Sequence, residues 1–433
     1  MGTDSPAGLV LVGGSVVDMA GVARAKYVPA SRLDAFHRVG MGASPSWSVF
    51  TADGSIAFTP ELGVVGDLRI RIDPADLRVV ADGVGWAPGD LCTQDGPPSP
   101  MCGRAVLRRV VAMAQSAGLT ARVGAELECT LLAPGGEHAS GKGWAPYGLR
   151  SSLERAAFLV DLTEAAERAG LGIEQLHMEY GHDQLEISLS PTDPVSAADD
   201  VILARVVIGR AAERHGMRVS FSPVPFAGDA GNGAHLHLSL ADAGGPAFSG
   251  GDGPRGLTPT GSAAIAGVLE TLPELIAVYA GSTLSARRLV PGNWAGAALC
   301  WGLENREAAV RLVAGGTGSV HGANIELKVV DPSSNPYLAV AAFLGSACLG
   351  IQRELALPDE VAQNPVESRR TLQVLPPHQA AALDALEASA VARELLGAPV
   401  VEGLLAVRRH EVNTYSGLPI AEAAEALRLA WSC

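Results

Sequence analysis

The stretch Val123-Gly124-Ala125-Glu126-Leu127-Glu128-Cys129-Thr130-Leu131 alternates apolar and polar side chains along its length. In an extended strand, side chains two residues apart project to the same face of the sheet. The apolar residues of this stretch therefore share one face, and Glu126 and Glu128 share the other. The alternation predicts a strand with one buried face and two carboxylates that point the same way.

Other segments repeat this alternation, and their polar faces carry further carboxylates and imidazoles. These side chains are His235, His237 and Ser239 in residues 234–240, Asn324, Glu326 and Lys328 in residues 324–329, Glu186 in residues 185–189, and Glu179, which precedes Glu186 across a turn-like stretch.

A single strand of this kind is explained most simply by an antiparallel sheet with one solvated face. Taken together, the strands favour a polymetallic site, because crowded carboxylates repel one another unless cations lie among them. Oxygen-rich ligands with an occasional imidazole suit Mg²⁺ or Mn²⁺. The expected metal ligands are Glu126, Glu128, Glu179, Glu186, His235 and Glu326.

Length and composition set the protein class. A chain of 433 residues with 48% hydrophobic content can bury a large core. The net charge of −14 argues against nucleic acid or an acidic membrane surface as a partner. The six cysteines lack a paired spacing, and we expect free thiols and a cytoplasmic protein without a signal peptide. The longest apolar run, residues 336–351, is shorter than the roughly 20 residues of a membrane span, which predicts a buried helix.

The chain is predicted to have two domains. Residues 8 to 100 hold short alternating runs, such as 47–50 and 68–72, broken by Gly, Pro and Asp, which predicts a small β-rich domain. The Pro-rich residues 96–100 suggest domains of residues 1–103 and 104–433. Helices are expected from Arg104, from a capping box at residues 151–154 to about 170, from Asp193 to about 216, and over most of 371–433.

Residues 136–142 spell most of a phosphate-binding P-loop, but this interpretation fails. Position 143 is Gly, where the motif needs a hydroxyl, and a Trp-Ala-Pro sequence stands where a helix should begin. We expect a surface loop there.

A basic cluster accompanies the acidic one. Arg288, Arg306 and Arg311 lie within a short stretch of chain and, taken alone, are as readily a solvated set. Beside an acidic metal site, however, guanidinium groups are typical of a centre that transfers phosphoryl groups, because Arg binds phosphate and carboxylate oxygens with two parallel hydrogen bonds.

These residues occur within motifs that resemble glutamine synthetases along residues 45 to 377. The matching motifs, in the family's order, are Gly124-Ala125-Glu126-Leu127-Glu128, residues 179–186, Gly231-Asn232-Gly233-Ala234-His235-Leu236-His237, Arg288-Leu289-Val290-Pro291-Gly292, Asn305-Arg306 and Asn335-Pro336-Tyr337-Leu338.

The resemblance implies a fold, an activity and an assembly. The fold would be α+β, with a small N-terminal β-grasp domain (1–103) and a catalytic domain (104–433) of curved antiparallel sheet and helices. The activity would be ATP-dependent formation of γ-glutamyl phosphate, which an amine then attacks. The substrates would be glutamate, ATP and an amine, and the chain would form a homo-oligomeric ring, a dodecamer, with no membrane or nucleic acid as partner.

The resemblance also implies residue roles. Two or three Mg²⁺ or Mn²⁺ ions would bind, with Glu128, Glu179 and Glu186 at one and Glu126, His235 and Glu326 at another. ATP would contact His237, Ser239 and Arg311, and glutamate or the transferred phosphate would contact Gly231, Arg288, Arg306 and Lys328. Arg306, Arg311 and Arg288 would act in catalysis.

Trp294 departs from the family pattern, because true glutamine synthetases carry there a Glu that binds ammonium. An indole in its place supplies an aromatic wall that favours an organic amine. Together with Trp301-Gly302, this resembles the γ-glutamyl-polyamine synthetase subgroup, so a glutamate–polyamine ligase is the leading expectation. The alternatives are a Trp294 that merely packs the loop, an authentic glutamine synthetase, and a catalytically silent nucleotide-binding regulator.

Overall fold

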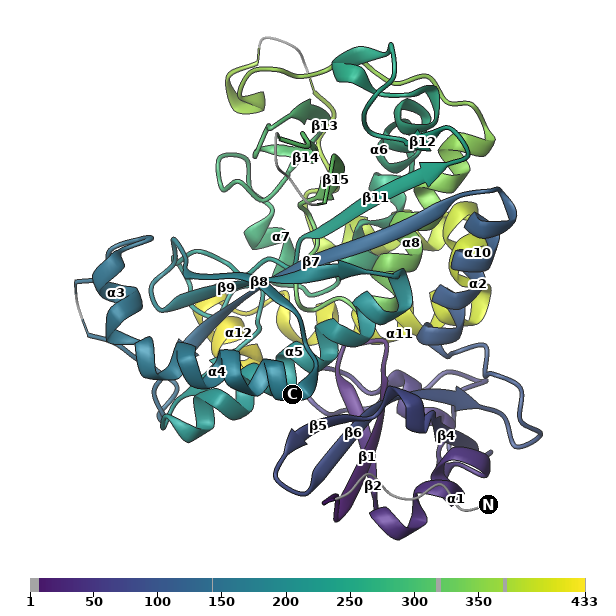
Figure 1. The fold of residues 1–433 in the computed structure, drawn as a ribbon, viewed down its shortest axis with the longest axis vertical. Helices are drawn as coiled ribbons and strands as arrows, with labels where there is room; N and C mark the ends of the chain where they lie inside the picture. The colour runs from purple at the N-terminus through teal and green to yellow at the C-terminus, as the bar shows by residue number, and fades with distance from the viewer. Residues whose placement is uncertain (1–7, 142, 317–320, 369–371, 433) are drawn as a thin grey trace.

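A computed structural model describes residues 8–432 except 142, 317–320 and 369–371. The strands form a smaller sheet near the N-terminus and a larger sheet beyond it (Figure 1). The smaller sheet has the order β2-β1-β6-β4-β3, with β5 beside β6. Its strands are β1 (Leu11–Val17), β2 (Ala23–Pro29), β3 (Met41–Ala43), β4 (Leu68–Ile72), β5 (Arg78–Ala81) and β6 (Val84–Cys92).

The smaller sheet confirms the expected β-rich N-terminal unit. β1 pairs antiparallel with β2 and parallel with β6, and α1 (Leu33–Arg38) packs on β4. The expected extended run at residues 47–50 is wrong, because residues 45–49 form a 3₁₀ helix, η2 (Pro45–Val49). Pro45 presets the backbone for a helical first turn, and the Ser44 hydroxyl accepts the Ser46 N–H, so the chain turns there instead of extending.

The larger sheet has the order β13-β14-β15-β11-β7-β9-β8, with β10 beside β7 and β12 beside β11. Its pairs are antiparallel except for β13 and β14, which run parallel, so the expected antiparallel sheet is in fact mixed. Its strands are β7 (Thr120–Leu132), β8 (Ile173–Met178), β9 (Gln184–Thr192), β10 (Arg218–Ser220), β11 (Leu236–Asp242), β12 (Gly245–Pro246), β13 (Ala298–Leu303), β14 (Ala308–Val313) and β15 (Asn324–Leu327).

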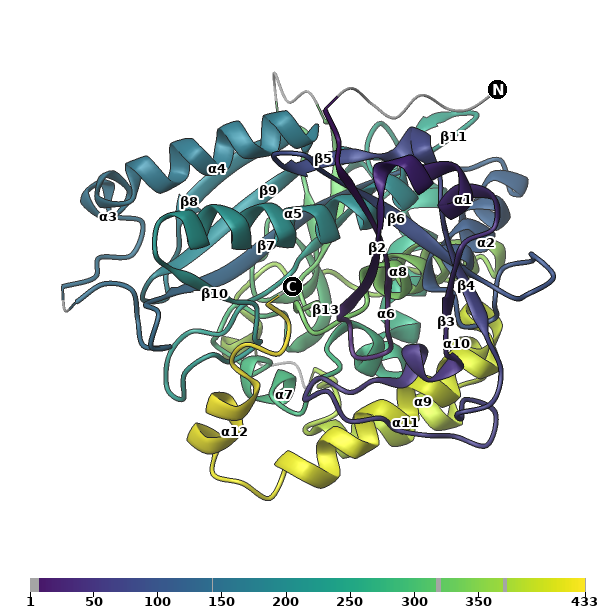
Figure 2. The ribbon, with the colours of Figure 1, turned by 90° about the horizontal axis from the view of Figure 1, so that it is seen from below.

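Helices cover this sheet and supply the core. Figure 2 shows α4 and α5 lying along β7, β8 and β9, and α5 contacts β7 and β9. The helices are α2 (Gly103–Ser116), α3 (Leu149–Glu154), α4 (Ala156–Ala169), α5 (Pro194–Arg214), α6 (Pro259–Tyr279), α7 (Ser285–Arg288), α8 (Pro336–Gln352), α9 (Gln379–Ala388), α10 (Ala390–Leu396), α11 (Ala398–Tyr415) and α12 (Ile420–Leu427), with short 3₁₀ turns at η1 (Ala30–Arg32), η3 (Pro74–Asp76), η4 (Pro254–Gly256) and η5 (Pro365–Glu367).

The predicted helices can be compared with these elements. The helix that opens at Asp193 is confirmed, since its carboxylate accepts the N–H groups of Val195 and Ser196. The capping box at residues 151–154 is wrong. Ser151 lies inside α3, and its hydroxyl donates to the carbonyl of Ala145 instead of accepting a helix N–H, while α4 begins at Ala156 without a side-chain cap.

Two apolar helices pack against each other in the core. α8 is buried from Pro336 to Gly350, as its sequence predicts, and it contacts α6. Within the described ranges, α6 alone is long and apolar enough to cross a membrane, but 78% of its most apolar window is buried inside the protein. α6 is therefore a core helix.

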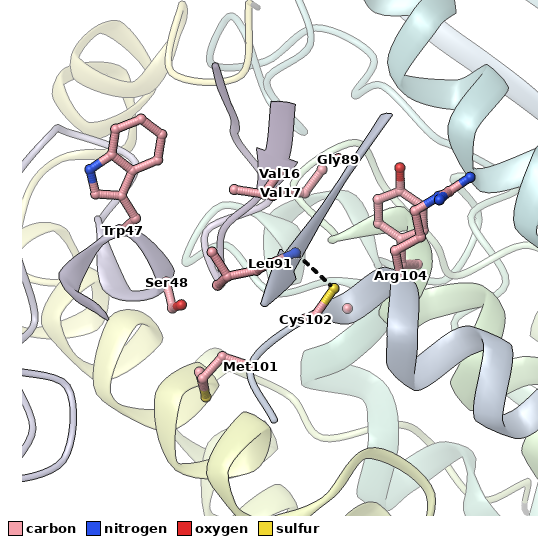
Figure 3. Close-up of a pocket in the computed structure, with 11 residues that line it drawn as sticks. Val16, Val17, Trp47, Ser48, Gly89, Leu91, Met101, Cys102 and Arg104 are labelled. Atoms are coloured by element: carbon pink, nitrogen blue, oxygen red, sulfur yellow. Dashed lines mark hydrogen bonds between the residues drawn. The ribbon is translucent and has the colours of Figure 1, made fainter. Parts of the chain in front are cut away.

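A small cavity lies between the smaller sheet, η2 and the starts of α2 and α8 (Figure 3). α2 begins at Gly103, directly after the Pro-rich stretch, and the Leu91 N–H of β6 donates to Cys102 Sγ at 3.4 Å. The cavity beside it has a volume of about 10 Å³, which is room for about one water molecule. A cavity of this size is too small to hold a substrate. A domain boundary between residues 103 and 104 stays a prediction.

Candidate active site

The carboxylates and imidazoles predicted from the alternating segments gather on the larger sheet. Strand register brings them together, because Glu128 on β7 lies opposite Glu186 on β9, and His237 on β11 lies opposite Glu326 on β15. The apolar side chains of β7 are buried, which confirms the prediction that they share the buried face of this strand. Antiparallel neighbours on one face have Cβ atoms roughly 5 Å apart, close enough to share an ion.

His235 lies at the centre of the cluster, in the residue before β11. Its Nδ1 is 3.1 Å from Glu126 Oε2 and 3.4 Å from Glu326 Oε1. Its Nε2 is 3.9 Å from Glu128 Oε1. Glu126 also approaches His237, with 3.3 Å between Oε1 and Nε2. Four of the expected donors and His237 thus lie within reach of one another.

A second group forms around Glu179 and Glu186 at the end of β8. His177 Nε2 lies 3.9 Å from Glu179 Oε2 and 3.8 Å from Glu186 Oε1. Sequence reasoning missed His177, although it stands two residues before Glu179 and so shares its face of an extended segment. It also missed Tyr147, which donates its hydroxyl to Glu179 Oε1 at 2.9 Å from a loop whose sequence carries no such signal.

Glu128 is held by the protein itself. Its Oε2 accepts the Gly233 N–H at 2.7 Å and the Gln184 side-chain amide at 3.0 Å. The same Gln184 amide donates to the Gly231 carbonyl at 2.9 Å. Residue 231 must be glycine, because a Cβ there would lie 2.4 Å from the Pro223 carbonyl oxygen. These bonds fix the irregular segment of residues 231–233 against the cluster.

The cluster carries unbalanced negative charge. Burial, and then the charges of neighbouring carboxylates, chiefly Glu126, raise the pKa of Glu186 to about 9. Burial works against ionisation of Glu326 as well, but the Lys328 ammonium and His235 outweigh it and lower its pKa to about 2. Burial would lower the pKa of His237, but its hydrogen bond to Glu126 raises it to about 9. Some carboxylates here are stabilised as anions while another is forced to hold a proton.

The donor set fits divalent cations. Within the acidic cluster, three groups of side chains lie close enough to share an ion: Glu126, Glu186 and His235; Glu126, His237 and Glu326; and His177, Glu179 and Glu186. Among the described residues, Glu179 Oε2 is buried and accepts no hydrogen bond. Carboxylate oxygens with an imidazole suit Mg²⁺ or Mn²⁺ better than a structural zinc site. The resemblance places Glu179 and Glu186 with Glu128 at one metal ion. In the structure these two carboxylates instead form a group with His177.

The basic residues lie at different depths. Arg288 is buried and donates to the backbone carbonyls of Val329 and Lys328 at 3.2 and 3.1 Å, and burial lowers its pKa. Its Nη2 also lies 3.2 Å from His235 Nε2. This guanidinium therefore borders the acidic cluster, and the catalytic role of Arg288 stays a prediction.

Arg311 and Lys328 both bind Glu326. Arg311 Nη1 donates to Glu326 Oε2 at 3.2 Å, and Lys328 Nζ donates to Oε1 at 2.9 Å. Arg306 is exposed in the turn between β13 and β14. Ser239 lies two residues beyond His237 on the same face of β11. The residues expected to contact ATP thus lie along one edge of the cluster.

Trp294 is not a core residue. Its side chain is 62% exposed, so the alternative in which it merely packs the loop is wrong for this chain. Its φ of 55° is in the left-handed region, which costs a side chain about 1–2 kcal/mol. The backbone around it is held by Glu307, whose carboxylate accepts the N–H groups of Gly292 and Trp294. Sequence reasoning did not identify Glu307.

The P-loop-like stretch has a structural role. Its described residues form bends and an isolated bridge between His138 and Leu132, and Lys142 lies outside the described residues. The Ser140 N–H donates to Asp183 Oδ2 at 2.7 Å, and Arg155 donates to Asp183 Oδ1 at 2.9 Å. His138 stacks on His182 with ring centroids 4.3 Å apart. The loop therefore covers a buried carboxylate beside the Glu179 segment and is a surface loop, as expected.

Comparisons with known proteins agree with this geometry. Residues 100–423 match the family model for the catalytic domain of glutamine synthetase. The chain is 39% identical to "Gamma-glutamylpolyamine synthetase GlnA3" of Streptomyces coelicolor, over 93% of this chain and 89% of that protein. It is 32% identical to a glutamine synthetase of Mycolicibacterium smegmatis, over 81% and 82%. A solved structure described as a novel glutamine synthase homolog superposes with a TM-score of 0.87 at 32% identity, covering 100% of both chains.

Proposed function

Because the chain belongs to the glutamine synthetase family, we propose that it is an ATP- and Mg²⁺-dependent ligase that joins the γ-carboxylate of glutamate to an organic amine, with a polyamine as the favoured acceptor. The choice of an organic amine rests on the exposed indole of Trp294, which stands where a carboxylate would bind ammonium. The 39% identity to a γ-glutamylpolyamine synthetase supports the same choice.

The reaction has two steps. An oxygen of the glutamate γ-carboxylate attacks the terminal phosphorus of ATP, and ADP leaves, which makes the γ-carbonyl carbon reactive. The amine nitrogen then attacks that carbon, the bond from carbon to the phosphate oxygen breaks, and the nitrogen loses a proton. The activation is needed because a free carboxylate is a poor electrophile.

The side chains of the site divide these tasks. Glu126, Glu128, Glu179, Glu186, His235 and Glu326 would hold two or three Mg²⁺ or Mn²⁺ ions, with His177 beside them. The ions, when bound, would neutralise phosphate oxygens and so favour attack at phosphorus.

The cationic side chains would bind the charged ends of the substrates. Arg306 and Arg311 would stabilise charge on the transferred phosphoryl group, while Arg288, Gly231 and Lys328 would contact glutamate or that phosphate. His237 and Ser239 would contact ATP. Trp294 would contact the alkyl chain or the ammonium group of the amine. We also propose a homo-oligomeric ring, as in the family.

A direct assay tests the proposed function. The purified protein is incubated with ATP, Mg²⁺ and glutamate against ammonium, putrescine, spermidine, spermine, ethanolamine and a monoamine, and phosphate release and product mass are followed. Glu326→Gln serves as the control that ties turnover to this site. A γ-glutamyl-polyamine product with little glutamine is expected, and glutamine alone would refute the amine assignment.

An ammonium-dependent glutamine synthetase is the second candidate, because the chain is 32% identical to enzymes of that name. A glutamine synthetase would need a base other than residue 294 to take the proton from ammonium. ATP turnover that saturates with ammonium at modest concentration, without amide formation from larger amines, would favour it. Failure to hydrolyse ATP with every amine would instead favour a silent regulatory homologue.

A further inference from the structure

The segment that carries Trp294 has an exposed indole, and the residues that follow this indole are packed against the protein. It runs from Val290 to Ala297, between α7 and β13. Ala295 and Ala297 are only 3% and 5% exposed, whereas Trp294 is 62% exposed. A Cβ at Gly296 would lie 2.9 Å from Lys328 Cβ, so the backbone there touches the residue that follows β15. The indole therefore projects into solvent from a segment whose following residues, 295–297, are packed.

Glu307 holds the other side of this segment. Its Oε1 accepts the Gly292 N–H at 2.7 Å, and its Oε2 accepts the Trp294 N–H at 2.9 Å. The side chain is 5% exposed, so these bonds are shielded from water. Hydrogen bonds to an ionised acceptor are about twice as strong as bonds between neutral groups. Both carboxylate oxygens of Glu307 therefore accept strong hydrogen bonds from the backbone of the loop.

The backbone at Trp294 needs such support. A non-glycine residue with φ of 55° lies in a sparsely populated region and stays there only when its surroundings hold it. The N–H of the same residue is the group that Glu307 binds. Without that acceptor, nothing in the local sequence favours the left-handed conformation for a Trp, and the indole would be free to reorient.

Glu307 is itself fixed. It follows Arg306 in the turn between β13 and β14, and its N–H donates to Asn305 Oδ1 at 3.2 Å. Asn305 in turn donates its side-chain amide to the Val361 carbonyl at 2.7 Å. The turn that presents Arg306 and the loop that presents Trp294 are therefore joined through one buried carboxylate.

We infer that Glu307 is a positioning residue, which holds the Trp294 indole in place at the acceptor side of the site and so sets the preference for organic amines. The part concerning amines rests on the proposed function. A wall that is already ordered before the amine arrives loses less conformational entropy on binding, and this favours amines long enough to contact it.

Amide hydrogen exchange tests the positioning without any assay of activity. Glu307→Ala and Glu307→Gln are compared with the wild-type protein by mass spectrometry of peptides covering residues 290–297. In Glu307→Ala the amides of Gly292 and Trp294 should exchange on the order of tenfold faster or more, because their acceptor is gone. Glu307→Gln retains one carbonyl oxygen and should fall between. Unchanged exchange in Glu307→Ala would overturn the inference.

Glu360→Ala is the matched control. The Glu360 carboxylate also accepts a backbone N–H, that of Leu303 at 3.1 Å, in the neighbouring strand, and it pairs with Arg255. Its loss removes a carboxylate–amide bond near the site but leaves the Trp294 segment alone. Exchange in residues 290–297 should stay at the wild-type rate, and an equal rise in both variants would mean general loosening and would refute a specific role for Glu307.

Amine selectivity tests the consequence. The ratio of kcat/KM for spermidine to kcat/KM for ammonium should fall about tenfold in Glu307→Ala, through a higher KM for spermidine. Trp294→Ala removes the indole itself and should lower the ratio further, by roughly 30-fold. The double variant should fall no further than Trp294→Ala, because both changes remove the same wall. An additive fall would overturn the coupling, and a rise in the glutamate KM equal to that for spermidine would show that Glu307 acts through Arg306 instead.

Hydrogen exchange and amine selectivity together distinguish the proposed function from the proposed role of Glu307. If the wild-type protein makes only glutamine, the proposed function and the selectivity role both fail, while hydrogen exchange still decides whether Glu307 holds the loop. If polyamine products form and exchange does not change, the proposed function stands and the role of Glu307 is refuted.

Discussion

Replacing Trp294 with glutamate should convert the acceptor preference of this protein from long amines toward ammonium. The change removes an indole that is 62% exposed and introduces the carboxylate that the family resemblance predicts for an ammonium site at this position. Trp and Glu are both non-glycine residues at a φ of 55°, so the backbone strain should change little. The effect is therefore expected in acceptor binding rather than in folding.

The magnitude follows from the exposed area of the indole. A Trp side chain presents roughly 200 Å², of which 62% remains exposed here. An alkyl amine that covers about 40 Å² of it gains on the order of 1 kcal/mol at about 25 cal/mol per Å². A cation–π contact at a partly exposed ring adds about 1 kcal/mol. The loss of about 2 kcal/mol predicts a fall of roughly 30-fold in kcat/KM for spermidine.

The assay compares spermidine, a monoamine and ammonium at saturating ATP and glutamate, with product masses as the readout. Trp294→Phe is the control, because it keeps an aromatic face and should retain most of the preference for spermidine. The KM for glutamate should stay the same in both variants. An amine profile that does not change in Trp294→Glu would refute the role assigned to this indole, whatever the effect on kcat.

Three further predictions concern the metal cluster and the loop beside it. First, burial and neighbouring carboxylates raise the pKa of Glu186 from an ordinary 4.5 to about 9. Between pH 4.5 and about 9 the folded protein therefore binds a proton that the unfolded chain does not. The stability of the metal-free protein should fall as pH rises through this range. Mg²⁺ should displace the proton, so titration calorimetry at pH 7.5 should show a heat that depends on the ionisation enthalpy of the buffer, and a buffer-independent heat would contradict this. Second, Tyr147→Phe removes the donor to Glu179 Oε1 and should weaken Mn²⁺ binding about tenfold in a spectroscopic titration; an unchanged affinity would show that this hydroxyl does not orient the carboxylate. Third, Asp183→Ala leaves Arg155 unpaired beside a buried site and should lower the free energy of unfolding by about 3–5 kcal/mol in urea titrations. Asp183→Asn also removes the charge but keeps one acceptor oxygen and tolerates the left-handed backbone, so it should cost less. An unchanged free energy of unfolding in Asp183→Ala would contradict the role given to this ion pair.

The part of the site that lies on strands was predictable from sequence. Alternation along β7 and β11 assigns Glu126, Glu128 and His237 to polar faces, because a strand has a fixed period of two. The family motifs then identify which polar faces belong together. Sequence alone does not show register between distant strands, and the opposition of Glu128 and Glu186 depends on pairing that only the folded sheet fixes.

The part of the site that lies on loops was not predictable. Tyr147 and Glu307 stand in turns, where no period relates one residue to the next, and each acts through a contact with a residue far along the chain or with a backbone N–H. The capping box at residues 151–154 failed for a related reason, since a Ser hydroxyl can bond to several nearby backbone groups and the sequence does not say which. Local patterns identify faces, whereas long-range contacts decide what those faces meet.

Strands and loops also divide the chemistry of this protein. The strand residues around His235 hold a dense set of charges, and a change at one of them should disturb others, because neighbouring carboxylates raise the pKa of Glu186 and Glu126 works against the lowered pKa of Glu326. The Trp294 loop is held instead by Glu307, in the turn between β13 and β14, and by the close approach of Gly296 to Lys328. Under the proposed function, a change in the loop should therefore exchange the acceptor and leave phosphoryl transfer intact. For this reason we expect variants of the loop to change which amine is used, and variants of the strands to abolish turnover with every amine.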